Sequence, residues 1–350
     1  MTNIQIGIGG DLTGLRGRLS GRSYEGNFEE QFVHLKELIG SYDASASIDF
    51  IECRPPEHSP EEFGQVALKH AMPVRQFSFS CDVDGLHSRL FSIQALRENL
   101  ELARRTGTID RISLQVQGNN ERPSIEDLVD FYIEAESVAR DYGIDLYSET
   151  HVDRFTYDPR RLVAVHESLS NRTGGVLGLR VNADFSHYIH QLGNSHFCNS
   201  EDIAAGRLKI DPLDPTNYVT QNIISAGLVG MGHLRVAIPN NLTRTEGTIQ
   251  YPVVDPKLDP DTAHLPYGGM KCAWNAGPLK SWLGWYREVF SYQLSRPERP
   301  VARFSSEYIG DGKPGYYGVD QYRNLFQNIA MVSMAHGMIR EVQSALAQHA

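Results

Sequence analysis

Four residues that can bind a metal ion or move a proton stand where strand-like segments of this sequence end. They are Glu149, Asp184, His233 and Glu307, and His187 follows Asp184 by three positions. A carboxylate and an imidazole placed where a strand gives way to a loop can share a metal ion or a substrate. Whether the side chains meet depends on the order of the elements that carry them.

Strand-like and helical segments alternate along the sequence, with apolar residues at every second position in the first kind and at helical spacing in the second. The strands are expected at 4–9, 48–53, 74–81, 112–116, 144–149, 176–184, 233–238 and 301–307. The helices are expected at 28–39, from 59, at 92–105, at 124–142, from 158, at 278–294 and at 322–346. This alternation predicts an α/β protein, a (β/α)8 TIM barrel that occupies residues 1–350 as one domain.

The connection that follows the seventh strand is much longer than an ordinary strand-to-helix loop. It runs from Pro239 to Pro300 and includes the seventh helix. The remainder, about 240–275, is predicted to be an ordered insertion at the catalytic end of the barrel. The sequence leaves open whether this insertion covers a substrate, forms a surface excursion or contacts another subunit of a homo-oligomer.

In a barrel, inward-facing residues at the carboxyl ends of the strands meet in one pocket. The carboxylates of Glu149, Asp184 and Glu307 would then gather around His233. Three negative charges so close together repel one another unless a proton or a cation offsets them. An oxygen-rich set with one imidazole suits one divalent metal ion, Mn2+ first, with Mg2+, Co2+ and Zn2+ as alternatives. The competing interpretation is a structural network of buried charges paired with arginines, for which the candidates are Arg180, Arg235 and Arg303.

Four further residues are candidates for binding a substrate. His187 follows the predicted ligand Asp184, and His151 continues the phase of Glu149 beyond its strand. His151 could equally be a fifth ligand or a solvated loop residue. Arg235 could contact an anion or a hydroxyl group, or pair with Glu307. Gln115 on the fourth strand could contact substrate hydroxyl groups or belong to a polar layer inside the barrel.

Composition narrows the classes of function. The formal net charge is −10, which argues against a nucleic-acid groove as the main binding surface. The N-terminal sequence has no signal-peptide pattern, and no apolar run approaches the roughly 18 residues that a membrane helix needs. The 4 cysteines are far apart in the sequence and are expected to be reduced thiols. These features lead us to expect a cytoplasmic enzyme that acts on a small molecule.

The order of the predicted ligands resembles a known family. Glu at the fifth strand, Asp-x-x-His at the sixth, His at the seventh and Glu at the eighth are similar to the pattern of the xylose isomerase-like TIM-barrel superfamily. That superfamily includes ketose 3-epimerases, sugar-phosphate isomerases and epimerases, inosose dehydratases and endonuclease IV. The resemblance implies that Glu149, Asp184, His233 and Glu307 are the metal ligands and that His187 contacts the substrate or lies beside the metal.

The resemblance also implies a reaction. Glu149 and Glu307 would act as acid and base on opposite faces of a sugar, keto-sugar or cyclitol, and a metal-stabilised enediolate would form between them. The implied activity is that of an isomerase or epimerase. Loss of a β-hydroxyl group or of a glycoside from the same site would instead make the protein a lyase. An endonuclease IV-like nuclease, which the acidic composition disfavours, and a non-catalytic binding barrel are the remaining alternatives.

Two features depart from the family pattern. The epimerases usually carry an arginine soon after the strand-five glutamate, whereas here His151 and Asp153 lie between Glu149 and Arg154. The segment after the seventh strand is also longer than in compact epimerases. Substrate preferences of the epimerases are therefore not carried over to this sequence.

Overall fold

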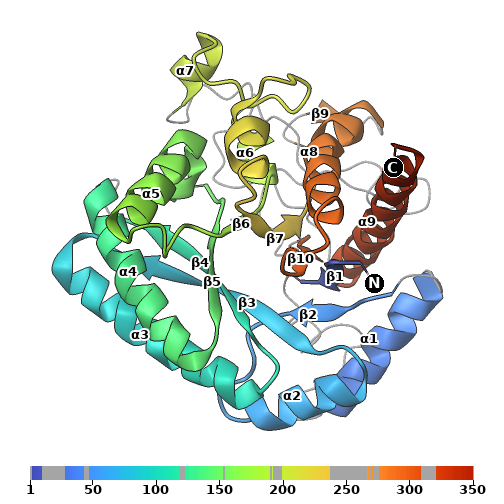
Figure 1. Ribbon diagram of the computed structural model, residues 1–350. Coiled ribbons are helices and arrows are strands. Elements are labelled where there is room, and N and C mark those ends of the chain that lie inside the picture. Colours follow the sequence, from blue (N-terminus) through green and yellow to red (C-terminus); the bar gives the residue numbers. More distant parts are fainter. Residues whose placement is uncertain are drawn as a thin grey trace.

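The computed structural model describes residues 2–9, 28–42, 47–118, 123–152, 154–189, 191, 199–236, 266–267, 270–271, 276–308 and 321–349. Within these ranges, eight parallel strands close into a barrel in the order β1-β10-β7-β6-β5-β4-β3-β2 (Figure 1). The barrel strands are β1 (Ile4–Ile8), β2 (Phe50–Glu52), β3 (Val74–Asp82), β4 (Arg111–Gln117), β5 (Asp145–Glu149), β6 (Val181–Ala183), β7 (Val229–Leu234) and β10 (Ala302–Ser306). The predicted (β/α)8 barrel is confirmed.

Helices lie outside the strands and cover the barrel wall (Figure 1). They are α1 (Phe28–Tyr42), α2 (Pro60–Lys69), α3 (Gly85–Thr106), α4 (Ile125–Tyr142), α5 (Pro159–Arg172), α6 (Ser186–Ile189), α7 (Ser200–Ala204), α8 (Ala276–Leu294) and α9 (Gln321–His349). No helix in the described ranges is both long enough and apolar enough to cross a lipid bilayer.

Local sequence signals account for several helix ends. The Ser124 side chain accepts a hydrogen bond from the backbone N–H of Asp127 (3.0 Å), so it caps the first turn of α4. Pro60 and Pro159 stand at the first positions of α2 and α5, where a missing N–H costs nothing. Gly143 ends α4 with a φ of 67°, a left-handed conformation that glycine adopts without strain.

Two predicted strands differ from the structure by more than two residues at one or both ends. The seventh strand was expected at 233–238 but is Val229–Leu234, so His233 lies near its end and not at its start. Gly230 and Gly232 lie inside this strand. Glycine weakens a strand, so the sequence did not indicate one at these positions. A Cβ at position 232 would lie 2.6 Å from the Phe304 ring, which explains the need for glycine there. The sixth strand is shorter than the predicted 176–184, because only Val181–Ala183 pairs with its neighbours.

The described part of the chain includes little of the predicted insertion at 240–275. Only Pro266–Tyr267 and Met270–Lys271 are described there, and they form a separate two-stranded antiparallel pair, β8 and β9. The expectation that this segment covers a substrate or contacts another subunit lies outside the described residues. The helix predicted at 278–294 is present as α8.

The amino end of the barrel is closed by polar and aromatic side chains. Arg111 donates to the backbone oxygens of Gly230 and Val301, and its guanidinium lies 5.3 Å from the centre of the Tyr147 ring. Arg303 forms an ion pair with Asp110 at the same end. The cluster of titratable residues described below lies at the opposite, carboxyl end of the barrel.

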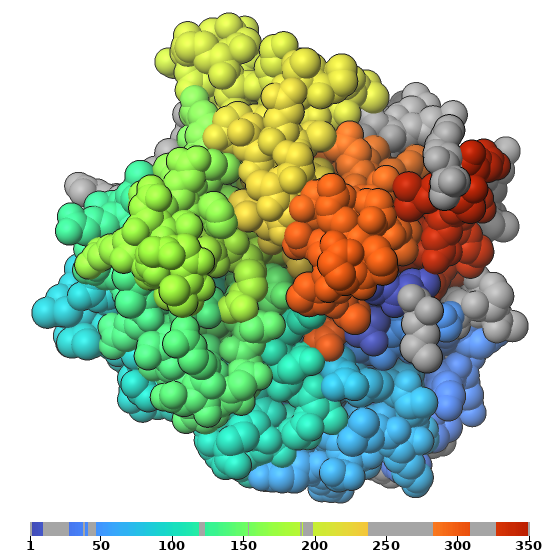
Figure 2. All heavy atoms as spheres, viewed as in Figure 1, coloured from blue at the N-terminus to red at the C-terminus, as the bar shows by residue number. Residues whose placement is uncertain are grey.

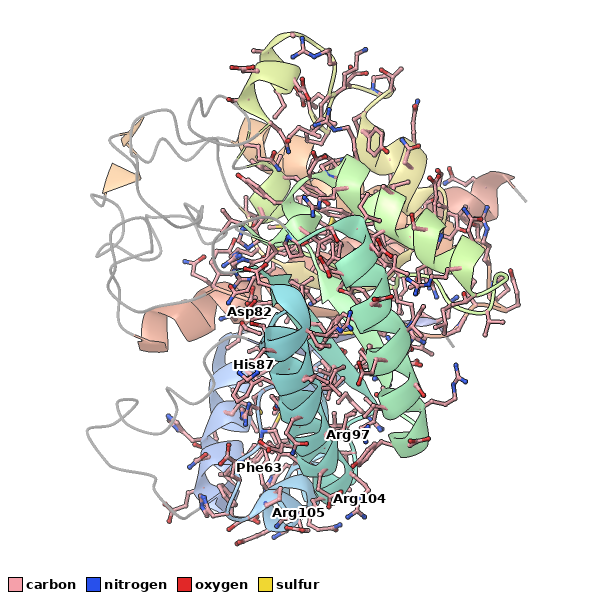
Figure 3. All side chains as sticks on the ribbon, turned by 90° about the vertical axis from the view of Figure 1, so that its left-hand side faces the viewer. Phe63, Asp82, His87, Arg97, Arg104 and Arg105 are labelled. Atoms are coloured by element: carbon pink, nitrogen blue, oxygen red, sulfur yellow. The ribbon has the colours of Figure 1, made fainter. Side chains whose placement is uncertain are left out.

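The helices run back along the strands toward this closed end. Figure 3 shows Asp82 and His87 at one end of α3 and Arg104 and Arg105 at the other. Figure 2, in the view of Figure 1, shows that the segment around α7, in yellow, projects from the upper edge of the molecule.

Close packing between α2 and α3 generates a prediction about stability. A Cβ at Gly64 would lie 2.1 Å from the backbone oxygen of Thr106, whereas Gly40 has nothing within 4 Å of that position. Gly64→Ala should therefore lower the free energy of unfolding by about 1–3 kcal/mol. Gly40→Ala, the matched control in α1, should be neutral or stabilising by up to about 1 kcal/mol. Chemical denaturation of both variants measures the difference, and equal stabilities would contradict the packing described.

Candidate active site

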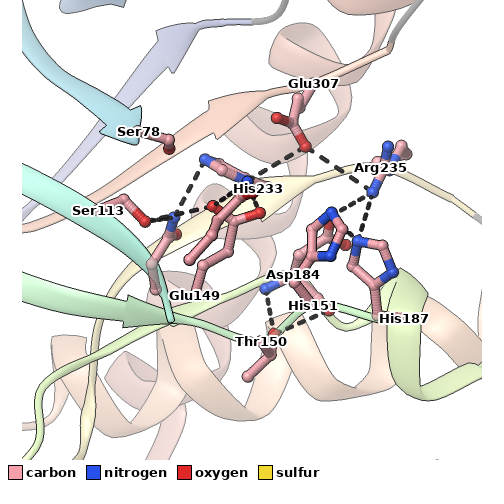
Figure 4. Close-up of polar contacts among 12 residues, drawn as sticks. Ser78, Ser113, Glu149, Thr150, His151, Asp184, His187, His233, Arg235 and Glu307 are labelled. Carbon is pink, nitrogen blue, oxygen red and sulfur yellow. Dashed lines mark hydrogen bonds and ion pairs between the residues drawn. The ribbon is translucent and has the colours of Figure 1, made fainter. Parts of the chain in front are cut away.

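Four predicted ligands converge at the carboxyl end of the barrel (Figure 4). Glu149 ends β5, Asp184 follows β6, His233 lies near the end of β7, and Glu307 follows β10. Each offers a ligand atom, and these atoms all lie within 4.8 Å of one another. Glu149, Asp184 and His233 are at most 1% exposed, while the Glu307 side chain is 18% exposed. The site is therefore buried, and it is most open to solvent at Glu307.

His233 stands between the acidic residues. Its Nδ1 lies 3.5 Å from Glu149 Oε1 and 3.2 Å from Glu307 Oε2, and it makes no hydrogen bond. Its Nε2 lies 3.0 Å from Glu52 Oε1 and 3.1 Å from Asn182 Nδ2. Burial alone would lower the pKa of His233, but the charges of Glu307, Glu52 and Glu149 together raise it well above its usual value.

Two side chains of β4 hold Glu149 in place. Ser113 Oγ and Gln115 Nε2 donate to Glu149 Oε2 at 3.3 and 3.1 Å. Burial would raise the pKa of Glu149, but the nearby charge of His233, with smaller contributions from His151 and Gln115, lowers it to about 2. Glu149 is therefore ionised at neutral pH. Gln115, which is predicted to bind substrate, contacts the predicted metal ligand Glu149.

Asp184 is paired with Arg235 inside the protein. Arg235 Nη2 lies 2.5 Å from Asp184 Oδ2 and 3.8 Å from Glu307 Oε2, so Asp184 is its main partner. Ser186 donates to Asp184 Oδ1 through both its N–H (3.0 Å) and its hydroxyl (2.5 Å). Burial still raises the pKa of Asp184, aided by the charge of Glu307, and the opposing charge of Arg235 does not fully offset it.

Two of the three arginines that were candidates for a purely structural network of buried charges lie away from this cluster. Arg180 pairs with Glu136 and Asp145, both at 2.7 Å. Arg303 pairs with Asp110 at the amino end. The expectation that Arg180 or Arg303 pairs with the strand-end carboxylates is therefore wrong, and Arg235 alone of the three lies within ion-pair distance of them.

The residues of the cluster fit a divalent cation. Three carboxylates and one imidazole offer their ligand atoms to a common centre, and the buried Nδ1 of His233 points at two of the carboxylates without a hydrogen bond. At an effective dielectric constant of about 20, two like charges about 5 Å apart repel by roughly 3 kcal/mol. A divalent cation at this centre would attract each carboxylate and so offset these repulsions.

A second group lies beside the first. Glu149, His151 and His187 also offer ligand atoms within 4.8 Å of one another, and the two imidazole rings lie 4.2 Å apart. However, Arg235 Nη2 lies 3.0 Å from His187 Nε2, so that nitrogen accepts a hydrogen bond from a positive group. His151 Nδ1 lies 2.6 Å from the backbone oxygen of Val152. A second cation here would be repelled by the positive charge of Arg235. His151 and His187 are therefore better placed to contact a bound small molecule than to hold a second metal ion.

Sequence reasoning missed Glu52. It ends β2 as Glu149 ends β5, it is 7% exposed, and it contacts His233 directly. The sequence contains a signal for it: Phe50 and Glu52 lie two positions apart on one strand, so their side chains point to the same face. Within the described residues, Cys53 and Cys81 form no disulfide bond; Cys198 and Cys272 lie outside those residues, so the reduced state of all four stays a prediction.

The pKa directions predict how metal affinity depends on pH. A cation must displace protons from His233 and Asp184, whose pKa values are raised in the metal-free protein. The affinity for Mn2+ should therefore rise as the pH increases from about 6 to about 8. Calorimetry in buffers with different ionisation enthalpies should also show net proton release. An affinity that is constant over this range would contradict the protonation states assigned to these two residues.

Comparisons with solved structures place the fold among known proteins. A xylose isomerase-like TIM-barrel protein from Mycobacterium smegmatis in complex with magnesium superposes with a TM-score of 0.54 at 13% identity, covering 97% of this chain and 99% of that one. L-ribulose 3-epimerase gives 0.55 at 11% identity, covering 99% and 98%. The IolI protein with a bound zinc atom gives 0.53 at 13% identity, covering 97% and 99%.

The likeness lies in three-dimensional structure and not in sequence. No family model matches the sequence, and no curated protein matches it either. The superpositions extend over nearly the whole length of both chains, and their identities of 11–13% are informative about architecture only. The chain therefore has the fold of the xylose isomerase-like TIM barrels.

Proposed function

We propose that this protein is a divalent-metal-dependent isomerase or epimerase of a sugar, keto-sugar or cyclitol. One observation carries the proposal: the ligand atoms of Glu149, Asp184, His233 and Glu307 lie within 4.8 Å of one another in a buried site. The site occupies the carboxyl end of the barrel strands, where active sites of this architecture lie. The names of two structural neighbours, L-ribulose 3-epimerase and a xylose isomerase-like protein, support the same class of reaction.

These four residues would hold the cation. When bound, it supplies Lewis acidity that stabilises negative charge on substrate oxygens. Mn2+ remains our first choice because three of the four ligand atoms are carboxylate oxygens. The neighbours were solved with magnesium in one case and zinc in another, so both ions belong in any test of metal preference.

Glu149 and Glu307 are proposed to transfer the proton. Both approach Nδ1 of His233, at 3.5 and 3.2 Å, and they come from different strands of the barrel. The lowered pKa of Glu149 keeps this carboxylate ionised and able to accept a proton next to a carbonyl group. Glu307, which is more exposed to solvent, would return a proton on the opposite face of the substrate.

The remaining candidates divide into two roles. Gln115 and Arg235 hold Glu149 and Asp184, so they are proposed to orient the ligands. His151 and His187 have adjacent rings beside the cluster, and they are proposed to contact substrate hydroxyl groups. This assignment retains all four residues in the site but gives Gln115 and Arg235 a supporting task.

Metal analysis and isotope exchange test the proposal together. Protein purified without chelator should contain or take up about one equivalent of divalent metal. With Mn2+ in deuterated water, one compound of a panel of ketoses, 3-keto sugars and cyclitols should exchange a carbon-bound hydrogen without change of composition. Loss of water or of a glycoside would instead identify a lyase. Failure to bind metal would contradict both reactions.

The acid and base roles generate a variant test. Glu149→Gln and Glu307→Gln should each lower the rate of exchange at least about 100-fold, because each removes a proton-transfer group. Glu136→Gln is the matched control, since Glu136 is largely buried against Arg180 (2.7 Å) on the outer side of the barrel wall. It should leave the exchange rate unchanged. Exchange by both site variants at the rate of the unmodified protein would exclude the proposed roles.

A further inference from the structure

Glu52 lies next to the proposed metal site without belonging to its ligand set. We propose that it is a positioning residue: its carboxylate accepts the Nε2 proton of His233 and so keeps the ring oriented with Nδ1 directed at Glu149 and Glu307. The inference deepens the proposed function and rests on it for the role of Nδ1. The contact between Glu52 and His233 stands on its own geometry.

The carboxylate of Glu52 is fixed by side chains from three other strands. Gln76 Nε2 donates to Oε2 at 2.8 Å, Ser78 Oγ donates to Oε1 at 3.2 Å, and Ser305 Oγ donates to Oε2 in a short hydrogen bond. His233 Nε2 lies 3.0 Å from Oε1. Both oxygens are therefore engaged on the side of the ring away from the cluster. Glu52 is therefore placed to orient His233, a proposed metal ligand, and not to bind the metal ion itself.

A carboxylate can only accept hydrogen bonds, so its partner nitrogen must carry the proton. This condition places a proton on Nε2 of His233. When a metal ion displaces the proton of Nδ1, the lone pair of that nitrogen can bind the ion, the usual arrangement for a metal-binding histidine whose second N–H is bonded to a carboxylate. The imidazole ring acts as a rigid spacer between Glu52 on one side and Glu149 and Glu307 on the other.

One neighbour would favour the opposite assignment. Asn182 Nδ2 lies 3.1 Å from the same Nε2 and 2.8 Å from Ser113 Oγ, while Asn182 Oδ1 makes no hydrogen bond. If the amide group donated to Nε2, the proton of a neutral ring would lie on Nδ1 and would block a metal ion. A half-turn of the amide places Oδ1 toward Nε2 as an acceptor; the Ser113 hydroxyl, 2.8 Å away, then donates to Oδ1 in place of Glu149 Oε2 (3.3 Å). The charge of Glu52 makes it the stronger acceptor of the two.

Two substitutions separate hydrogen bonding from charge. Glu52→Gln removes the charge but keeps an oxygen that can accept from His233. Gln76 Oε1 has no hydrogen-bond partner, so its amide can turn to accept from the new side-chain amide. Glu52→Leu is of similar size and removes both charge and acceptor. Ser78→Ala is the control, because it removes one partner of Glu52 without touching His233.

The first readout does not require a metal. In full-length protein labelled with ring-15N histidine, His233 should give a slowly exchanging, downfield Nε2–H signal, identified by its loss in His233→Asn. We expect it to move upfield in Glu52→Gln, to disappear in Glu52→Leu and to persist in Ser78→Ala. Absence of the signal in the unmodified protein, or an unchanged position in Glu52→Gln, would overturn the proposal even if Glu52→Leu fails to fold.

The second readout is the Mn2+ affinity of metal-stripped protein, measured by competition with a fluorescent chelator. Glu52→Leu should weaken binding about 10–100-fold, Glu52→Gln by less than about tenfold, and Ser78→Ala least of the three, because Gln76 and Ser305 still hold the carboxylate. Equal losses in the first two variants would show that Glu52 acts through its charge alone and would overturn the positioning role. Absence of Mn2+ binding by unmodified protein would instead refute the proposed function, while the ring-proton signal would still decide the Glu52–His233 bond.

Discussion

The mutual repulsion of buried carboxylates is the constraint on which the rest of this site depends. Glu52, Glu149, Asp184 and Glu307 lie at the carboxyl ends of four strands, three of them almost fully buried and Glu307 partly so. Such groups are costly to bury unless opposite charges or several hydrogen bonds compensate them. Each of these acids has its own compensation, and the pattern of compensation distinguishes their roles.

Glu52 and Asp184 are the most completely satisfied within the protein. Glu52 is surrounded by donors, and Asp184 is bonded to Arg235 and to Ser186. Glu149 is partly satisfied by side chains of β4, and its second oxygen faces His233. The contacts described for Glu307 are with His233 and Arg235. The remaining negative charge therefore faces the common centre at which these ligand atoms meet.

The barrel makes this arrangement possible by placing residues distant in sequence side by side. Ser305 and His233 are register partners on β10 and β7, and Glu149 and Asn182 are partners on β5 and β6. Parallel pairing aligns the strand ends, so short polar side chains one layer below the cluster can reach the carboxylates. Ser113 and Ser305 perform this task for Glu149 and Glu52.

The barrel and most of its ligand cluster could be predicted from the sequence because both depend on repetition. Alternation of strands and helices indicates the barrel, and the topology then brings the strand-end residues Glu149, His233 and Glu307 together. Glu52 was overlooked because the strand predicted at 48–53 ends at Cys53, whereas β2 ends at Glu52. The partner of Arg235 could not be predicted, because a difference of about 1 Å in side-chain placement decides between Asp184 and Glu307.

Anomalous X-ray scattering from crystals of the protein soaked with Mn2+ tests the central claim most directly. We expect one strong anomalous peak bounded by Glu149, Asp184 and Glu307 and by Nδ1 of His233. Glu52 should keep its contact with Nε2 on the far side of the ring. A cluster that remains without a peak at saturating Mn2+, or a peak that forms elsewhere, would contradict a metal site made of these four residues.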